Sequence, residues 1–292
     1  MIILPMTKIA LFTDTASDIN QYPELKDQVK VDGIIHTYIN IGEESFTEKD
    51  MNQEELLKRM DTDDTAMWPK TSQPSVGDFV EHYEKLKSEG FTDVISVHVA
   101  EGLSGTLNSA RLASQEVEGL NVYLVDSQLA SLGIIPTLVK VRGMMDQGMA
   151  PEEIQSIANE WALDNKAFAA VPTLDNLYKG GRLKPLRYRL GKILNFKPIL
   201  LMSNGAIVSH DKTRDLVATQ DKTYEYALEN LTSDDDFEFI IAHAWSEENA
   251  KKYEAKFKED FPGKKYYVGR AGTTISVHLG PGGVAFSVIR KN

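Results

Sequence analysis

The sequence predicts an α/β protein of two domains, and the order of its segments supports this in two ways. In the first half, apolar, β-branched runs at residues 8–14, 93–99 and 121–127 are each followed by a turn and a helical pattern. This alternation is typical of a parallel sheet covered by helices. From residue 166 onward, strand-like runs follow one another more directly, as they do in α+β domains.

Length and composition set limits on the class of protein. The chain has 292 residues, of which 42% are hydrophobic, enough for one large domain or two of ordinary size. A formal net charge of −11 argues against a nucleic-acid partner and against attraction of the whole molecule to anionic membranes. The start of the chain lacks the features of a signal peptide, and no window offers a membrane span. A cytoplasmic protein is therefore expected.

The residue types also limit the chemistry. The chain contains no cysteine, which excludes disulfides, thiol nucleophiles and cysteine-ligated metals. Its six histidines are scattered without metal-ligand spacing. We therefore expect neither a metal nor a cofactor.

The first domain is predicted to span residues 1–165. Its helices are indicated by apolar spacing at 52–61 and 76–90, and at 151–165, where Pro151 stands at the start. Short β segments near 30–50 are interpreted as a small insertion, and 68–75 is interpreted as a proline-bounded loop.

The second domain is predicted to span residues 166–292. Strands are expected at 166–173 and in a hairpin from 197 to 214 that turns at Ser-Asn-Gly, followed by a helix near 214–230. A strand, a helix and further β segments follow. The last of these β segments is expected to cover residues 274–290.

The stretch GLSGTLNSA (102–110) predicts an anion site. It follows the strand at 93–99 and opens a helix at or near Ser104. Gly102 and Gly105 give access to backbone N–H groups, and Ser104 adds a hydroxyl donor. Free N–H groups at the start of a helix bind anions well.

Two other predicted strands end in polar pairs, Thr13-Asp14 and Asp126-Ser127. In an open parallel sheet, ligands bind beyond the carboxyl ends of the strands, so these groups are candidate ligand-binding residues. The alternative is that they only cap the helices that follow. The residues alone leave both interpretations open.

Known catalytic motifs do not fit the Ser104 turn. A nucleophile elbow needs G-x-S-x-G, and Gly105 comes one position too early. No P-loop ending occurs, and Asp14 lacks the second aspartate that aspartyl phosphatases use. A group of hydrogen-bond donors with no general base and no metal ion favours ligand binding over catalysis. A serine-dependent hydrolase or phosphotransferase acting through Ser104 is the alternative.

Six segments occur in order over nearly the whole chain: FTDTASDI, KTSQPSVGDF, LSGTLNSA, YLVDSQLASLG, LDNLYKGGRLKPLRYRLGKILNFKPIL and VHLGPGGVA. Together they resemble the DegV family of bacterial fatty-acid-binding proteins, and the segment 174–200 is the most specific match. Immediately before Leu-Ser-Gly-Thr, where the family often has serines, this chain has Ala100, Glu101 and Gly102.

The resemblance implies a carrier function. The carboxylate of a fatty acid would be held by Thr71, Ser104, Gly105 and, from the second domain, His278. The acyl chain, of roughly C14–C18 length, would lie in a tunnel between the domains, stabilised by burial of its methylenes. A separate ATP-binding fatty acid kinase subunit would then phosphorylate the carboxylate for phospholipid synthesis.

A basic cluster follows Gly181 in this acidic chain, consisting of Arg182, Lys184, Arg187 and Arg189. It is interpreted as a docking site for a partner, either the kinase subunit or an anionic membrane contacted transiently. The alternative is a solvated basic face.

Overall fold

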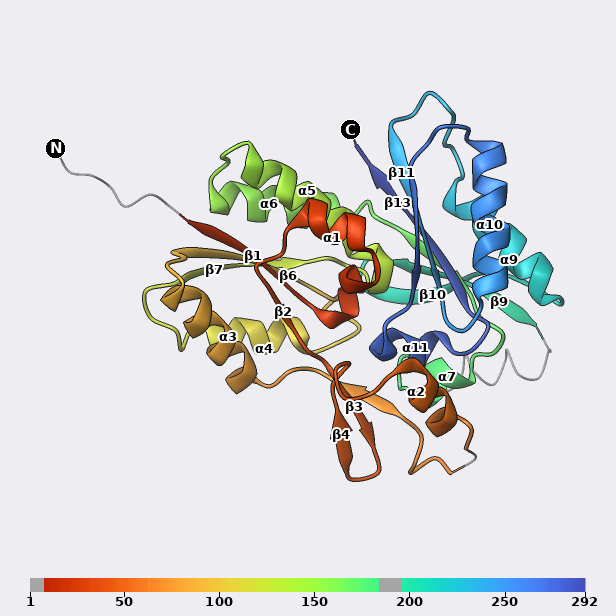
Figure 1. Ribbon diagram of the computed structural model, residues 1–292, viewed down its shortest axis with the longest axis horizontal. Helices are drawn as coiled ribbons and strands as arrows, with labels where there is room; N and C mark the ends of the chain where they lie inside the picture. Colours follow the sequence, from red (N-terminus) through yellow and green to blue (C-terminus); the bar gives the residue numbers. More distant parts are fainter. Residues whose placement is uncertain (1–7, 63, 184–195, 292) are drawn as a thin grey trace.

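The computed structural model describes residues 8–62, 64–183 and 196–291, which form two lobes with a smaller unit between them (Figure 1). One lobe holds a parallel sheet in the order β2-β1-β6-β7. Its strands are β1 (Ile9–Asp14), β2 (Gly33–Ile35), β6 (Asp93–His98) and β7 (Asn121–Asp126). The predicted α/β class with a parallel first sheet is confirmed.

Helices cover both faces of this sheet (Figure 1). The chain steps from β1 outward to β2 and then returns to β6 on the other side of β1. The carboxyl ends of β1 and β6 therefore flank the switch point at which open sheets bind ligands. The helices are α1 (Pro23–Val29), α5 (Ile135–Asp146) and α6 (Pro151–Ala162) on one face, and α3 (Val76–Ser88) and α4 (Thr106–Ser114) on the other.

Local sequence accounts for several of these elements. All six side chains of β6 are buried between two helical layers, including those of Asp93, Ser96 and His98. Ser75 and Asp78 form a reciprocal capping box at the start of α3, and Gly90 adopts a positive φ just beyond its end. Pro151 opens α6 with two glutamates in its first turn.

The small unit is a three-stranded sheet whose extent differs from the predicted insertion at 30–50. Its strands β3 (Tyr38–Ile41), β4 (Glu44–Phe46) and β5 (Lys70–Ser72) lie in the order β4-β3-β5, with α2 (Gln53–Met60) packed nearby. Residues 70–72, predicted as part of a loop, therefore form an edge strand. Antiparallel pairing with β3 positions Thr71 opposite Ile39.

The second lobe holds a six-stranded mixed sheet in the order β10-β9-β8-β13-β11-β12. Asn204 and Gly205, both at positive φ, turn the predicted hairpin. The last strand in sequence, β13, lies in the middle of the sheet. The elements are β8 (Ala167–Ala170), α7 (Asp175–Lys179), β9 (Lys197–Ser203), β10 (Ala206–Thr213), α9 (Leu216–Ala227), β11 (Phe237–His243), α10 (Glu247–Asp260), β12 (Tyr266–Arg270) and β13 (Val284–Arg290).

Residues 273–279 form a helix, α11 (Thr273–Leu279), and the prediction of β structure there is wrong. Carboxylates from the first half of the chain satisfy its free N–H groups. Asp18 accepts the N–H of Gly272 at 3.0 Å, and Glu48 accepts those of Thr273 and Thr274. Gly280, at positive φ, ends the helix. Tertiary contacts thus override the β preference of Thr-Thr-Ile-Ser-Val.

One apolar core joins the two large lobes. It includes Leu11 and Val97 from the parallel sheet together with Leu200 and Ile240 from the mixed sheet. The mixed sheet has one face toward the first lobe, and helices α9 and α10 cover its opposite face (Figure 1). A ligand between the two lobes would therefore contact the face that is turned toward the first lobe.

Candidate functional site

A cavity lies between the parallel sheet, the mixed sheet and α11. About 880 Å³ of space between these elements is free of protein atoms, and part of it is open to solvent. Most of its wall is apolar. The apolar lining residues are Ala16, Val99, Leu103, Ala130, Ala169, Val171, Leu177, Leu200, Met202, Ile207, Ile275, Leu279 and Ala285.

Three of the predicted site residues line this cavity: Thr71, Ser104 and His278. Thr71 lies on edge strand β5, and His278 lies on α11. Thr71 Oγ1 lies 2.8 Å from His278 Nε2. A residue from the first half of the chain and one from the second are thus hydrogen-bonded to each other in the cavity wall.

His278 is neutral at physiological pH. Its burial, and then the positive charge of Arg182, lower its pKa to about 3. A neutral imidazole carries one N–H, and Nδ1 has no hydrogen-bond partner in the part of the chain that the structure describes. A proton on Nδ1 would be buried without an acceptor, so Nε2–H is favoured. Nε2–H then donates to Thr71, whose own O–H is free to donate into the cavity.

Ser104 stands between β6 and α4, as predicted. Its Oγ lies 2.9 Å from Thr106 Oγ1 and accepts the N–H of Thr106 at 3.3 Å. The structure thus combines the capping role with a position in the cavity wall. Gly105 is the N-cap of α4 but is absent from the lining. The side chain of Gln73 covers it so closely that a Cβ at Gly105 would lie 2.5 Å from the amide.

Arg182 lines the cavity and also the groove outside it. Its Nε donates to the carbonyl of Leu103 at 3.2 Å, and its Nη1 donates to that of Gly180 at 2.7 Å. No carboxylate among the described residues pairs with it, and burial lowers its pKa. It was predicted to bind a partner, yet its position also suits the head of a ligand. Arg187 and Arg189, predicted with it, lie outside the described residues, as does Lys184.

The strand-end pairs lie elsewhere, because none of Thr13, Asp14, Asp126 and Ser127 lines the cavity. Asp14 is fully buried and accepts the N–H of Ala16 at 2.9 Å. Asp126 accepts the N–H of Gln128, also at 2.9 Å. Asp14 thus caps the short helix at residues 15–17, whereas Asp126 binds the N–H of a turn residue and caps no helix.

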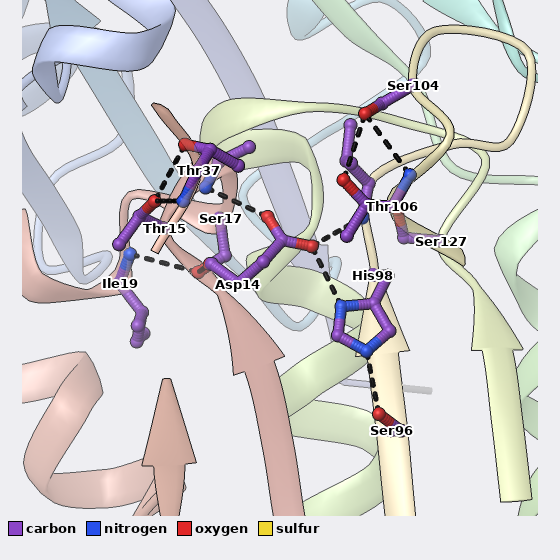
Figure 2. A network of polar contacts seen from close by, with 12 residues as sticks. Asp14, Thr15, Ser17, Ile19, Thr37, Ser96, His98, Ser104, Thr106 and Ser127 are labelled. Carbon is purple, nitrogen blue, oxygen red and sulfur yellow. Dashed lines mark hydrogen bonds and ion pairs between the residues drawn. The ribbon is translucent and has the colours of Figure 1, made fainter. Parts of the chain in front are cut away.

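Asp14 also belongs to a buried polar chain that Figure 2 shows. His98 Nδ1 lies 2.9 Å from Asp14 Oδ2, and Ser96 Oγ lies 2.6 Å from His98 Nε2. The order Ser-His-Asp is that of a catalytic triad. All three side chains are 0% exposed, however, and none lines the cavity. This series of hydrogen bonds links β1 to β6, and a substrate cannot reach it.

The comparisons with known proteins decide the family. The family model described as "Uncharacterised protein, DegV family" matches residues 8–291. The chain belongs to the DegV family. A DegV domain-containing protein of Listeria innocua is 33% identical over 286 residues, covering 96% of this chain and 98% of that protein.

Solved DegV-family structures share the fold over nearly the full length. The DegV fatty acid binding protein from Bacillus subtilis superposes with a TM-score of 0.84 at 28% identity, covering 98% of this chain and 100% of that one. A Thermotoga maritima protein described as revealing fatty acid binding function superposes with a TM-score of 0.81 at 29% identity, covering 97% and 99%.

Sequence reasoning missed other polar groups in the wall of this DegV-family cavity, namely Thr37, Ser72, Ser131 and Thr274. A signal for Thr274 was present, because it precedes His278 by four residues and would share its face on a helix. The prediction of a strand over 274–279 hid that spacing. Among the described residues, no helix is long and apolar enough to cross a membrane, and no group of side chains is placed to hold a metal ion.

Proposed function

We propose that this protein binds a long-chain fatty acid and presents it to a separate ATP-dependent kinase subunit in the cytoplasm. The acyl chain occupies the apolar cavity, Thr71 and Ser104 bind its carboxylate, and His278 orients Thr71 by donating Nε2–H to its hydroxyl. The observation that carries the proposal is Arg182, a partly buried guanidinium in the wall of an apolar cavity, without a carboxylate partner among the described residues. The Bacillus subtilis and Thermotoga maritima relatives are both described as fatty-acid-binding.

The energetics fit such a ligand. Burial of a methylene stabilises by about 0.8 kcal/mol, so a long chain offers on the order of 10 kcal/mol before the costs of association. Because that term has no direction, the few polar groups decide where the head lies. Hydrogen bonds from Thr71 and Ser104 to a carboxylate are charge-assisted, and Arg182 supplies the opposite charge.

The groove outside the cavity suits a kinase partner. Lys70, Lys179 and Arg182 line it together with Leu103, so the cations of an acidic protein gather where the head of the ligand would emerge. Such a surface favours an acidic partner, and a transient contact with an anionic membrane belongs to the same proposal. A carboxylate is already ionised at neutral pH, so the carrier needs no base of its own.

The purified protein is expected to carry endogenous fatty acid. Organic extraction followed by mass spectrometry measures it directly. A preparation that is free of lipid and binds no hexadecanoate at micromolar concentration would contradict the proposal. Treatment with an activated ester tests the hydrolase alternative, which requires a burst of acylation on Ser104.

Replacing Ser104 with Ala is expected to weaken fatty acid binding about tenfold to a hundredfold. One hydrogen bond to a charged group contributes about 1.5–3 kcal/mol. Loss of the cap to Thr106 alone would lower stability by about 1 kcal/mol and leave affinity unchanged. Calorimetric titration and thermal melting of the same samples separate the two roles. Ser114→Ala, at the far end of α4, is the control.

A further inference from the structure

A second polar pair lies in the cavity wall, deeper than Thr71 and His278. Thr37 and Thr274 both line the cavity, and their hydroxyl oxygens lie 2.7 Å apart. Thr274 precedes His278 by four residues on α11, which puts the two side chains on one face, about 5–6 Å apart. The cavity thus presents two pairs of polar side chains, Thr71–His278 and Thr37–Thr274, one helical turn apart.

The inner pair is connected to a third hydroxyl behind the wall. Thr37 Oγ1 lies 2.9 Å from Thr15 Oγ1, which also accepts the backbone N–H of Thr37 at 3.0 Å (Figure 2). Thr15 is 2% exposed and does not line the cavity. Thr15, Thr37 and Thr274 therefore form a short chain of hydroxyls that runs from the interior to the cavity wall.

One hydrogen of this chain has no acceptor. Three hydroxyls carry three hydrogens, and the two oxygen–oxygen contacts use two of them. No other acceptor for these hydroxyls is found among the described residues. If the third hydrogen were on Thr15, it would be buried without a partner, which is costly. On Thr37 or Thr274 it can be satisfied from the cavity, so the chain ends there as a donor.

We propose that this donor binds an oxygen carried by the acyl chain next to its carboxyl end, so that the preferred ligand is a fatty acid hydroxylated at its second or third carbon. This rests on the proposed function, in which Thr71, oriented by His278, and Ser104 bind the carboxylate. The inner pair then lies beside the first carbons of the chain. An unsubstituted chain places a methylene against the donor and leaves it unpaired. A site built to bond a hydroxyl discriminates against the analogue that lacks it.

Competition between two probes tests the proposal. Protein stripped of lipid is mixed with equal amounts of hexadecanoate and 3-hydroxyhexadecanoate, and native mass spectrometry reads the ratio bound. We expect about tenfold preference for the hydroxylated acid, the effect of one neutral hydrogen bond. In the double variant Thr37→Val with Thr274→Val, the preference should vanish, because neither acid then meets the donor. Ser276→Ala, which removes a hydroxyl of α11 that does not line the cavity, should keep the preference.

Three outcomes overturn the proposal. The first is equal occupancy by the two probes in wild type. The second is a double variant that loses hexadecanoate as strongly as the hydroxylated acid, because the donor would then serve the carboxylate. The third is that wild-type protein binds 12-hydroxyhexadecanoate, whose hydroxyl is far from the carboxylate, as well as it binds the 3-hydroxy acid. If no fatty acid binds at all, the proposed function itself fails, which is a distinct result.

Discussion

Asp14→Ala is expected to lower the free energy of unfolding by about 3–5 kcal/mol, the usual cost of removing one partner from a buried polar pair. Asp14 accepts the N–H groups of Ala16 and Val99, at 2.9 and 3.1 Å, and contacts His98. All of these groups are in the core, so water cannot replace the lost carboxylate. Urea unfolding followed by circular dichroism measures the change.

Asp27→Ala is the matched control for this variant. Asp27 is an exposed aspartate on α1 of the same lobe, and its loss should change stability by less than about 0.5 kcal/mol. Because Asp14 does not line the cavity, the Asp14→Ala molecules that remain folded should bind fatty acid as wild type does. If Asp14→Ala instead lost much of its affinity for fatty acid and little of its stability, Asp14 would belong to the ligand site.

Glu48→Gln is expected to stabilise the protein at alkaline pH and to have little effect below about pH 5. Burial, with a smaller contribution from the charge of Asp14, raises the pKa of Glu48 from 4.5 to about 7, although the N–H groups of Thr273 and Thr274 oppose the shift. The folded state therefore holds this proton more tightly than the unfolded chain does. Wild-type stability should fall as pH rises from about 4.5 to 7, by on the order of 3 kcal/mol.

Unfolding at several pH values between 5 and 8 tests this. Glutamine has no such proton to lose, so the advantage of Glu48→Gln should grow with pH and level off above 7. Glu43→Gln, an exposed glutamate in the same small unit, should follow the wild-type curve. The prediction is wrong if wild-type stability rises between pH 5 and 8 and Glu48→Gln is less stable than wild type throughout. That result would show that the folded protein favours the ionised form of Glu48.

Much of the parallel lobe could be predicted because its signals are local. The run at 93–99 is apolar and β-branched, and it is buried on both faces. The capping box of Ser75 and Asp78 marks a helix start within four residues. The Gly-rich turn at Ser104 likewise follows from neighbouring residues.

The region around α11 could not be predicted in this way, because the groups that form it are far away in sequence. The carboxylate of Asp18, which binds the N–H of Gly272, lies 254 positions earlier. The sequence of residues 273–279 does not predict that contact, and its β-branched residues favour a strand. The motif around His278 singled out a residue that lies in the cavity wall, but it indicated neither the helix that carries this residue nor the presence of Thr274 in the same wall.

The strand-end pairs illustrate a second limit. The carboxyl ends of parallel strands do meet at one edge, yet alternate side chains point in opposite directions. Asp14, the last residue of β1, contacts His98 in the core, whereas Ala16 lies in the short helix after the strand and lines the cavity. Sequence spacing predicted the edge of the sheet, whereas the direction of each side chain depends on how the loops leave it.

The position of β13 in the middle of the mixed sheet bears on how the protein matures on the ribosome. Both neighbours of β13, β8 and β11, are translated before it and cannot pair with each other. The cavity wall includes His278 of α11 and Ala285 of β13, so neither the Thr71–His278 contact nor the complete cavity can form before these elements have been synthesised. Insertion of β13 between β8 and β11 therefore completes the mixed sheet and the cavity together.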